Sequence, residues 1–270
     1  MPRLASALQA LRALDTLATR DTALSRVDPR AQLLTTLLFV VTLLSHGRYS
    51  VAALLPLALY PVVLAVQGQV PLRTLGYSLW LAAPFALMVG AFNPLLEPQP
   101  LLALAGVTVS AGWVSLAAIV LRTVLSVAAT VVLLAGTGML PLCTALARLG
   151  APQVLTTQLL FLHRYVFVLA GEALRMDTAR QLRGGGHPRM SLATYGSLLG
   201  HLLLRAFDRA QRVHQAMLAR GYTGNLPGQP TRGWRRADTR FMAGWSLYFL
   251  ALRLVDVPQA LGGWLAGAPA

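Results

Sequence analysis

The chain has 270 residues, of which 56% are hydrophobic and 12% charged, and its mean hydropathy is +0.59. This composition is that of an integral membrane protein. All 23 basic residues are arginine, and the absence of lysine excludes both a Walker A phosphate loop and a Schiff-base lysine. If ATP drives the work of this protein, a partner chain hydrolyses it.

Catalytic and metal sites are equally disfavoured. Cys143 is the single cysteine, which excludes an internal disulfide and a thiolate zinc cluster. The five histidines lack a tight metal-ligand spacing such as His-Glu-x-x-His, and the nine carboxylates are scattered. We therefore expect no catalytic residue, no metal site and no cofactor in this chain.

The first 30 residues are polar and basic, with five arginines. They contain no compact apolar region before a small-residue cleavage site, so they do not resemble a signal peptide. At their end, Asp28 is expected to cap the first helix and Pro29 to open it.

Apolar runs predict the membrane spans, because a hydrocarbon core of about 30 Å needs roughly 20 apolar residues per helix. Four spans are predicted before residue 138, the second of them interrupted by Pro56 and Pro61: 31–45, 51–66, 75–92 and about 113–134. A turn is expected from Asn93 to Pro100. Residues 101–142 are too long for one span, so a short segment is expected before Gly112.

Arg122 would then lie within the membrane, where insertion scales assign a charge a cost of about 3 kcal/mol. It should face a polar partner or the protein interior. Two interpretations stay open: a structural arginine bonded to neighbouring carbonyls, or a residue with a role in coupling.

Residues 175–240 contain twelve arginines against three aspartates, a net charge of +9. The positive-inside rule places this segment, and the basic N-terminus, in the cytoplasm. A fifth span over 240–255 would leave the C-terminus outside.

The sequence therefore predicts three regions: 1–137 with about four spans, 138–239 with cytoplasmic helices, and 240–270 with the last span and tail.

The cytoplasmic region is expected to begin with a short helix, 138–149, ended by Gly150 and Pro152. Residues 153–183 follow, apolar at first and charged from Arg175; another span is the alternative, against which His163 and Arg164 weigh. Residues 191–220 are amphipathic. Their predicted apolar stripe is Tyr195, Leu199, Leu202, Ala206, Ala210, Val213 and Met217, opposite Arg205, Asp208, Arg209, Arg212 and Gln215.

Both long helices are expected to end in an Arg-Gly pair, Arg183-Gly184 and Arg220-Gly221. Glycine suits the left-handed position that stops a helix, and arginine suits the negative end of the helix dipole, so simple capping is one interpretation. The presence of two Arg-Gly pairs, 37 residues apart, favours a second interpretation, in which they bind a partner. Their guanidinium groups can bind carboxylates of a partner in a bidentate way.

These motifs resemble the T component of energy-coupling factor (ECF) transporters, in which two coupling helices each end in Ala-Arg-Gly. The second motif is complete in Ala219-Arg220-Gly221, and the first has Leu182 in place of alanine before Arg183-Gly184. Further matches over nearly the whole chain are residues 27–34, Asn93-Pro94, 146–152 and 163–167. The lead-in at residues 14–30 resembles the cobalt-type CbiQ subgroup.

The resemblance implies an all-α integral membrane protein with about five transmembrane helices and long cytoplasmic coupling helices. It implies a non-catalytic scaffold in the inner membrane of a bacterial cell. Its partners would be the lipid bilayer, two ATPase subunits that bind ATP, and a substrate-binding membrane subunit that carries cobalt or nickel. Arg183, Gly184, Ala219, Arg220 and Gly221 would couple to the ATPases.

Four other classes of protein are alternatives. A vitamin-type T component stays open. A conventional ABC permease would carry a Glu-Ala-Ala-x-x-x-Gly loop, and residues 172–178 lack its second alanine and its glycine. A membrane enzyme lacks an acid/base or metal cluster. Nucleic-acid binding is weaker still, because a positive-inside segment explains the arginines.

Overall fold

The computed structural model describes residues 15, 20–96, 100–104, 107–183, 191–223 and 233–254. The chain divides into two compact units. One contains residues 17–138 and 232–270, so the last helix belongs with the N-terminal spans; the other contains residues 1–16 and 139–231. The three-region division expected from the sequence stays a prediction.

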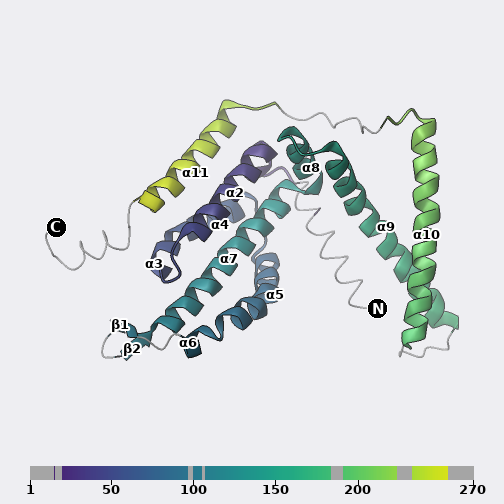
Figure 1. Cartoon of the computed structure of the whole chain (residues 1–270). Coiled ribbons are helices and arrows are strands. Elements are labelled where there is room, and N and C mark those ends of the chain that lie inside the picture. Colours follow the sequence, from purple (N-terminus) through teal and green to yellow (C-terminus); the bar gives the residue numbers. More distant parts are fainter. Residues whose placement is uncertain are drawn as a thin grey trace. The chain divides into compact units, whose positions relative to one another are not determined.

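The first unit is a helical bundle in which α2, α3, α4, α5 and α6 pack against the long helix α7 (Figure 1). Its elements, in chain order, are η1 (Leu24–Arg26), α2 (Pro29–Ser45), α3 (Val51–Leu54), η2 (Pro56–Ala58), α4 (Leu59–Gln67), α5 (Leu72–Gly90), α6 (Asn93–Leu96), β1 (Pro100–Leu104), β2 (Val107–Ser110), α7 (Ala111–Thr137) and α11 (Arg236–Leu254).

The first helix begins as the sequence predicts. Asp28 is the N-cap of α2, its carboxylate accepts from the Arg30 amide at 2.9 Å, and Pro29 is the first helical residue. The second predicted span is interrupted at Pro56, where α3 gives way to a 3-10 turn. The predicted interruption at Pro61 is wrong: Pro61 lies in the first turn of α4, where no intrahelical donor is needed, so the helix continues through it.

A short antiparallel hairpin, β1–β2, precedes α7. The expected all-α class therefore holds except for this hairpin, which is the short segment predicted before Gly112. The predicted fourth span is contained in α7. At Gly112 a Cβ atom would lie 2.4 Å from the Asn93 carbonyl oxygen, so glycine is required where α6 meets α7.

The starts of α2 and α11 and the end of α7 meet at one end of the bundle. The Asp28 amide donates to the Asp238 carboxylate at 2.8 Å. The Thr137 hydroxyl donates to Gln32 at 2.6 Å, and Gln32 in turn donates to the carbonyl of Leu24. The start of α2 and the end of α7 therefore lie at the same end of this bundle.

An aromatic cluster holds α11 in the bundle. Phe249 is 1% exposed and packs against Phe39 and Tyr60, with ring centroids 5.6 and 5.2 Å apart. Trp245 meets Tyr60 edge-on, and the Tyr248 hydroxyl donates to the Pro56 carbonyl at 2.8 Å. Buried aromatic pairs of this kind add about 1 kcal/mol each beyond area burial.

Three helices among the described residues are long and apolar enough to cross a membrane: α5, α7 and α9 (Gln153–Arg183). The apolar segments 29–45 and 51–67 are shorter, and α11 carries charges near both ends. On α5, Trp80 and Phe85 are 78% and 71% exposed, as expected of side chains that face hydrocarbon. The chain is therefore an integral membrane protein, and the predicted count of five spans stays a prediction.

The second unit contains three helices among its described residues: α8 (Met139–Arg148), α9 and α10 (Leu192–Ala219). Gly150 has φ +95° and ends α8, with the Ala151 amide donating to the Leu146 carbonyl at 3.0 Å. Ser191 caps α10 by accepting from the Thr194 amide at 3.1 Å. The predicted extents of all three helices are confirmed to within two residues.

Candidate functional site

Arg183 is the last residue of α9, and its side chain is exposed. The neighbouring Leu182 is 81% exposed. One turn earlier, Arg180 pairs with the buried carboxylate of Asp177 at 3.1 Å. This ion pair links two residues within the last turns of α9. Gly184 lies outside the described residues. The end of α9 therefore presents an arginine and a leucine outward.

The end of α10 has the complete hydrogen-bond pattern of a Schellman cap. Ala219 is the last helical residue, Arg220 is the C-cap, and Gly221 has φ +80°. The Gly221 amide donates to the Leu218 carbonyl at 2.9 Å, and the Tyr222 amide donates to Met217 at 3.0 Å. This cap confirms the predicted stop at Gly221 and leaves the Arg220 side chain exposed.

Helices α9 and α10 lie antiparallel. Arg183 lines the same cavity as Thr194 and Ser197, near the start of α10, whereas Val168 lines a cavity with Arg212. The 28 residues of α10 extend over about 42 Å at 1.5 Å per residue. The two predicted arginines are therefore not brought together: they stand at opposite ends of the helix pair, roughly 40 Å apart.

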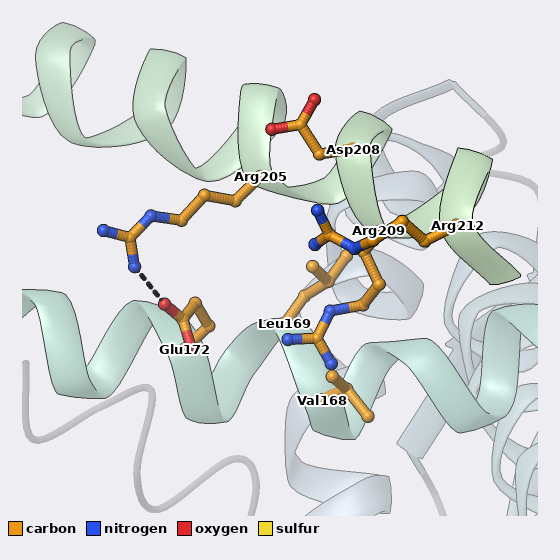
Figure 2. Close-up of a pocket in the computed structure, with 7 residues that line it drawn as sticks. All are labelled: Val168, Leu169, Glu172, Arg205, Asp208, Arg209 and Arg212. Carbon is orange, nitrogen blue, oxygen red and sulfur yellow. Dashed lines mark hydrogen bonds and ion pairs between the residues drawn. The ribbon is translucent and has the colours of Figure 1, made fainter.

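Glu172 joins the two helices, as Figure 2 shows. Its carboxylate accepts from Arg205 of α10 and pairs with Arg175 of its own helix at 2.7 Å. Sequence reasoning missed this pair, because 33 residues separate Glu172 from Arg205 and only the antiparallel packing brings them together. One signal was available: Glu172 is an isolated acid where the apolar part of α9 ends.

The predicted apolar stripe of α10 is partly confirmed. Of its predicted members, Leu202, Ala206, Val213 and Met217 are half-buried, whereas Ala210 is exposed. Leu198 joins them, a residue that the stripe did not include, while the predicted members Tyr195 and Leu199 are 41% and 60% exposed. A second apolar face is therefore uncovered on α10, with Leu199, Leu203 and Phe207 each more than half exposed.

Arg122 donates from α7 to the carbonyls of His46, at 2.8 Å, and Gly47. These carbonyls follow the last turn of α2, where the helix leaves acceptors without intrahelical donors. The contact matches the structural interpretation of Arg122.

Chemistry-bearing clusters are scarce in the part of the chain that the structure describes. No group of three or more His, Cys, Asp or Glu side chains there could hold a metal ion. His163 contacts the carboxylate of Asp15 at 3.1 Å, and Cys143 is buried. The cavity beside Arg183 also contains the polar side chains of Thr194, Ser197 and His201, and the cavity beside Val168 contains the carboxylates of Glu172 and Asp208.

Comparison with known proteins gives the family. The model of the CbiQ cobalt transport protein family matches residues 20–231. Cobalt transport protein CbiQ of Rhodobacter capsulatus is 36% identical over 92 residues, 34% of this chain and 38% of that one. CbiQ of Salmonella typhimurium is 28% identical over 164 residues, 54% of this chain and 71% of that one.

An uncharacterized protein of Methanocaldococcus jannaschii is 30% identical over 91 residues, 33% of this chain and 34% of that one. The matched segments thus span between a third and two-fifths of the Methanocaldococcus and Rhodobacter relatives. The family model, by contrast, extends from residue 20 through the α9–α10 pair and both Arg-Gly pairs. The chain therefore belongs to the CbiQ family of cobalt transport proteins.

Proposed function

We propose that this chain is the scaffold and coupling subunit, the T component, of an ECF-type ABC importer for cobalt or nickel in a bacterial inner membrane. The observation that carries the proposal is the α9–α10 pair. Two long helices, locked by Glu172 and Arg205, hold two exposed arginines about 40 Å apart. Such a separation suits contact with two partner subunits rather than one.

ATP hydrolysis is assigned to those partners. The chain has no lysine and hence no Walker A loop of its own. Its arginines at the helix ends offer planar, bidentate donors for acidic grooves on two ATPase subunits. Within the described residues neither Arg183 nor Arg220 has an ion-pair partner, which leaves both free for such contacts.

Closure of the ATPase pair would move the two helix ends relative to each other. Because the Glu172–Arg205 ion pair joins α9 to α10, the helix pair would respond by changing its crossing angle. The uncovered apolar face of α10, with Leu199, Leu203 and Phe207, would carry that change to a separate substrate-binding membrane subunit.

Cobalt or nickel is the preferred substrate, in place of a vitamin, because the named relatives are cobalt transport proteins. A relative from Methanocorpusculum labreanum, 30% identical over 111 residues, is a putative fused cobalt transport protein CbiMQ. This fusion supports a CbiM-type partner protein for the present chain.

The test is to replace Arg183 and Arg220 together by alanine and to measure cobalt uptake and co-purification of the ATPase subunits. Losing a buried, paired charge costs an interface about 2–5 kcal/mol, so we expect uptake to be abolished and co-purification to fall at least tenfold. Arg253→Ala is the matched control, because Arg253 is an exposed arginine in the last turn of α11. Normal uptake and assembly in the double variant would refute the proposal.

A further inference from the structure

The end of α9 and the start of α10 line a cavity of about 760 Å³ next to the Glu172–Arg205 contact. Its α9 side includes Glu172, Ala179 and Arg183, and its α10 side includes Thr194, Ser197 and His201. Along each helix these residues follow at steps of three, four or seven, so each set lies on one helix face. Both helices belong to the same unit, and the cavity is therefore a property of that unit.

The lining carries an excess of positive charge. Against the single carboxylate of Glu172 it contains four arginines: Arg175, Arg180, Arg183 and Arg205. Arg175 and Arg205 share the Glu172 carboxylate, and Arg180 pairs with Asp177, which lies outside the lining. These six side chains therefore retain two positive charges in excess. Arg183 makes no ion pair among the residues that the structure describes, so its charge is available to a partner.

Uncharged polar side chains of α10 face the same cavity. Thr194 is half-buried there, and Ser197 and His201 are exposed. A hydroxyl group and an imidazole N–H can each donate a hydrogen bond to a carboxylate, and a guanidinium group can donate two. The combination of Arg183 with these donors therefore suits an acidic side chain.

The two Arg-Gly ends offer different surfaces to a partner. At the Arg183 end, only eight residues connect α9 to α10, which limits how far the start of α10 can lie from Arg183. Toward the Arg220 end the two helices diverge, as Figure 1 shows. Leu218, Ala219 and Arg220 are all exposed there. A partner at the Arg183 end can therefore contact both helices, whereas a partner at the Arg220 end meets α10.

We propose that the two ATPase contacts are unequal, because an acidic segment of one ATPase subunit enters the cavity at the Arg183 end, while the contact at the Arg220 end uses α10 alone. This inference rests on the proposed function and deepens it. Arg183 pairs with a carboxylate of that segment, and Ser197 and His201 donate hydrogen bonds to it. Charge complementarity favours this occupant, since the lining has positive charge to spare.

The test changes the charge inside the cavity of the assembled transporter. Cross-linking to the ATPase subunits is measured from Leu182→Cys and from Leu218→Cys, at two exposed leucines. We expect Ser197→Glu to lower the Leu182→Cys link about tenfold, because like charges repel at an interface, and to leave the Leu218→Cys link unchanged. Ser197→Arg should retain both links, which separates an effect of charge from a disturbance of the helix.

Gln211→Glu is the matched control, because it adds the same charge at an exposed position of α10 outside this cavity. It should leave both links unchanged. The proposal fails if Ser197→Glu leaves the Leu182→Cys link intact, or if it lowers both links equally. It also fails if Ser197→Glu abolishes binding of inorganic phosphate to the purified chain while both links persist, since the cavity then takes a free anion. If neither thiol links to an ATPase subunit before any charge is changed, the proposed function itself is wrong, and this inference falls with it.

Discussion

Glu172 of α9 accepts a hydrogen bond from Arg205 of α10, 33 residues later in the chain. The Glu172 side chain is only 16% exposed, whereas that of Arg205 is 62% exposed. This contact joins α9 to α10, while Arg175 of α9 pairs with the same carboxylate from within its own helix.

Glu172→Gln should loosen the helix pair, since it removes the charge that both arginines share. Partly exposed pairs contribute about 1 kcal/mol or less each, so we expect a broader separation of the helices rather than unfolding. Spin labels at Met176 and Leu198, which line one cavity, measure this as a wider distance distribution. Exchanging the charges, with Glu172→Arg and Arg205→Glu, should narrow it again; an unchanged distribution in Glu172→Gln would contradict the assignment.

Gly221→Ala should weaken the end of α10 through backbone conformation alone. No heavy atom lies within 4 Å of a Cβ built there, but φ is +80°, which costs an L-residue about 1–2 kcal/mol. Amide exchange of residues 217–222 should accelerate several-fold. Gly221→Asn is the control and should be milder, because asparagine tolerates the left-handed region. Equal exchange in the alanine variant would show that the cap does not depend on glycine.

Arg122→Leu should destabilise the bundle, because the carbonyls of His46 and Gly47 lose their donor. An acceptor left without a partner costs about 1–3 kcal/mol. The measurement is thermal unfolding in detergent, with Arg73→Leu as a control at an exposed position of α5. A variant that unfolds normally yet transports no cobalt would favour the coupling interpretation of Arg122 instead.

Asp238→Asn should release the start of α11 from α2. The Asp238 carboxylate accepts from the amides of Asp28 and Arg235, both at 2.8 Å, and is 2% exposed. The amide NH₂ of asparagine cannot accept the second bond, so we expect a loss of about 1–3 kcal/mol and faster proteolysis before α11. Asp21→Asn, at an exposed aspartate, is the control and should leave proteolysis unchanged.

The sequence predicts the features that depend on neighbouring residues. Asp28 and Pro29 open α2, Gly150 and Gly221 stop α8 and α10, and Pro56 interrupts the second span, as expected. Each depends on a backbone preference of the residue itself or on a hydrogen bond within one turn. Such local signals can be recognised in the sequence without knowledge of the fold.

Features that join distant segments were not predictable. The Asp28–Asp238 contact spans 210 residues and the Glu172–Arg205 contact spans 33. The residues next to each of these side chains in the sequence do not indicate which distant residue it contacts. For the same reason the stripe on α10 was placed one position off at Leu199, since half-burial at Leu198 depends on where α9 crosses. Helix α9 is also long and apolar enough to be a membrane span. Composition alone therefore does not decide whether α9 crosses the membrane or lies in the cytoplasm.

The central claim is that the ends of α9 and α10 contact two ATPase subunits at once. Leu182→Cys and Leu218→Cys place a thiol at each end, where the leucines are 81% and 53% exposed, while the native Cys143 is buried and serves as the background control. With a short cross-linker, we expect each variant to link to an ATPase subunit. The double variant should yield one species containing this chain and two ATPase subunits. Links to no ATPase subunit, or from only one of the two ends, would contradict the claim.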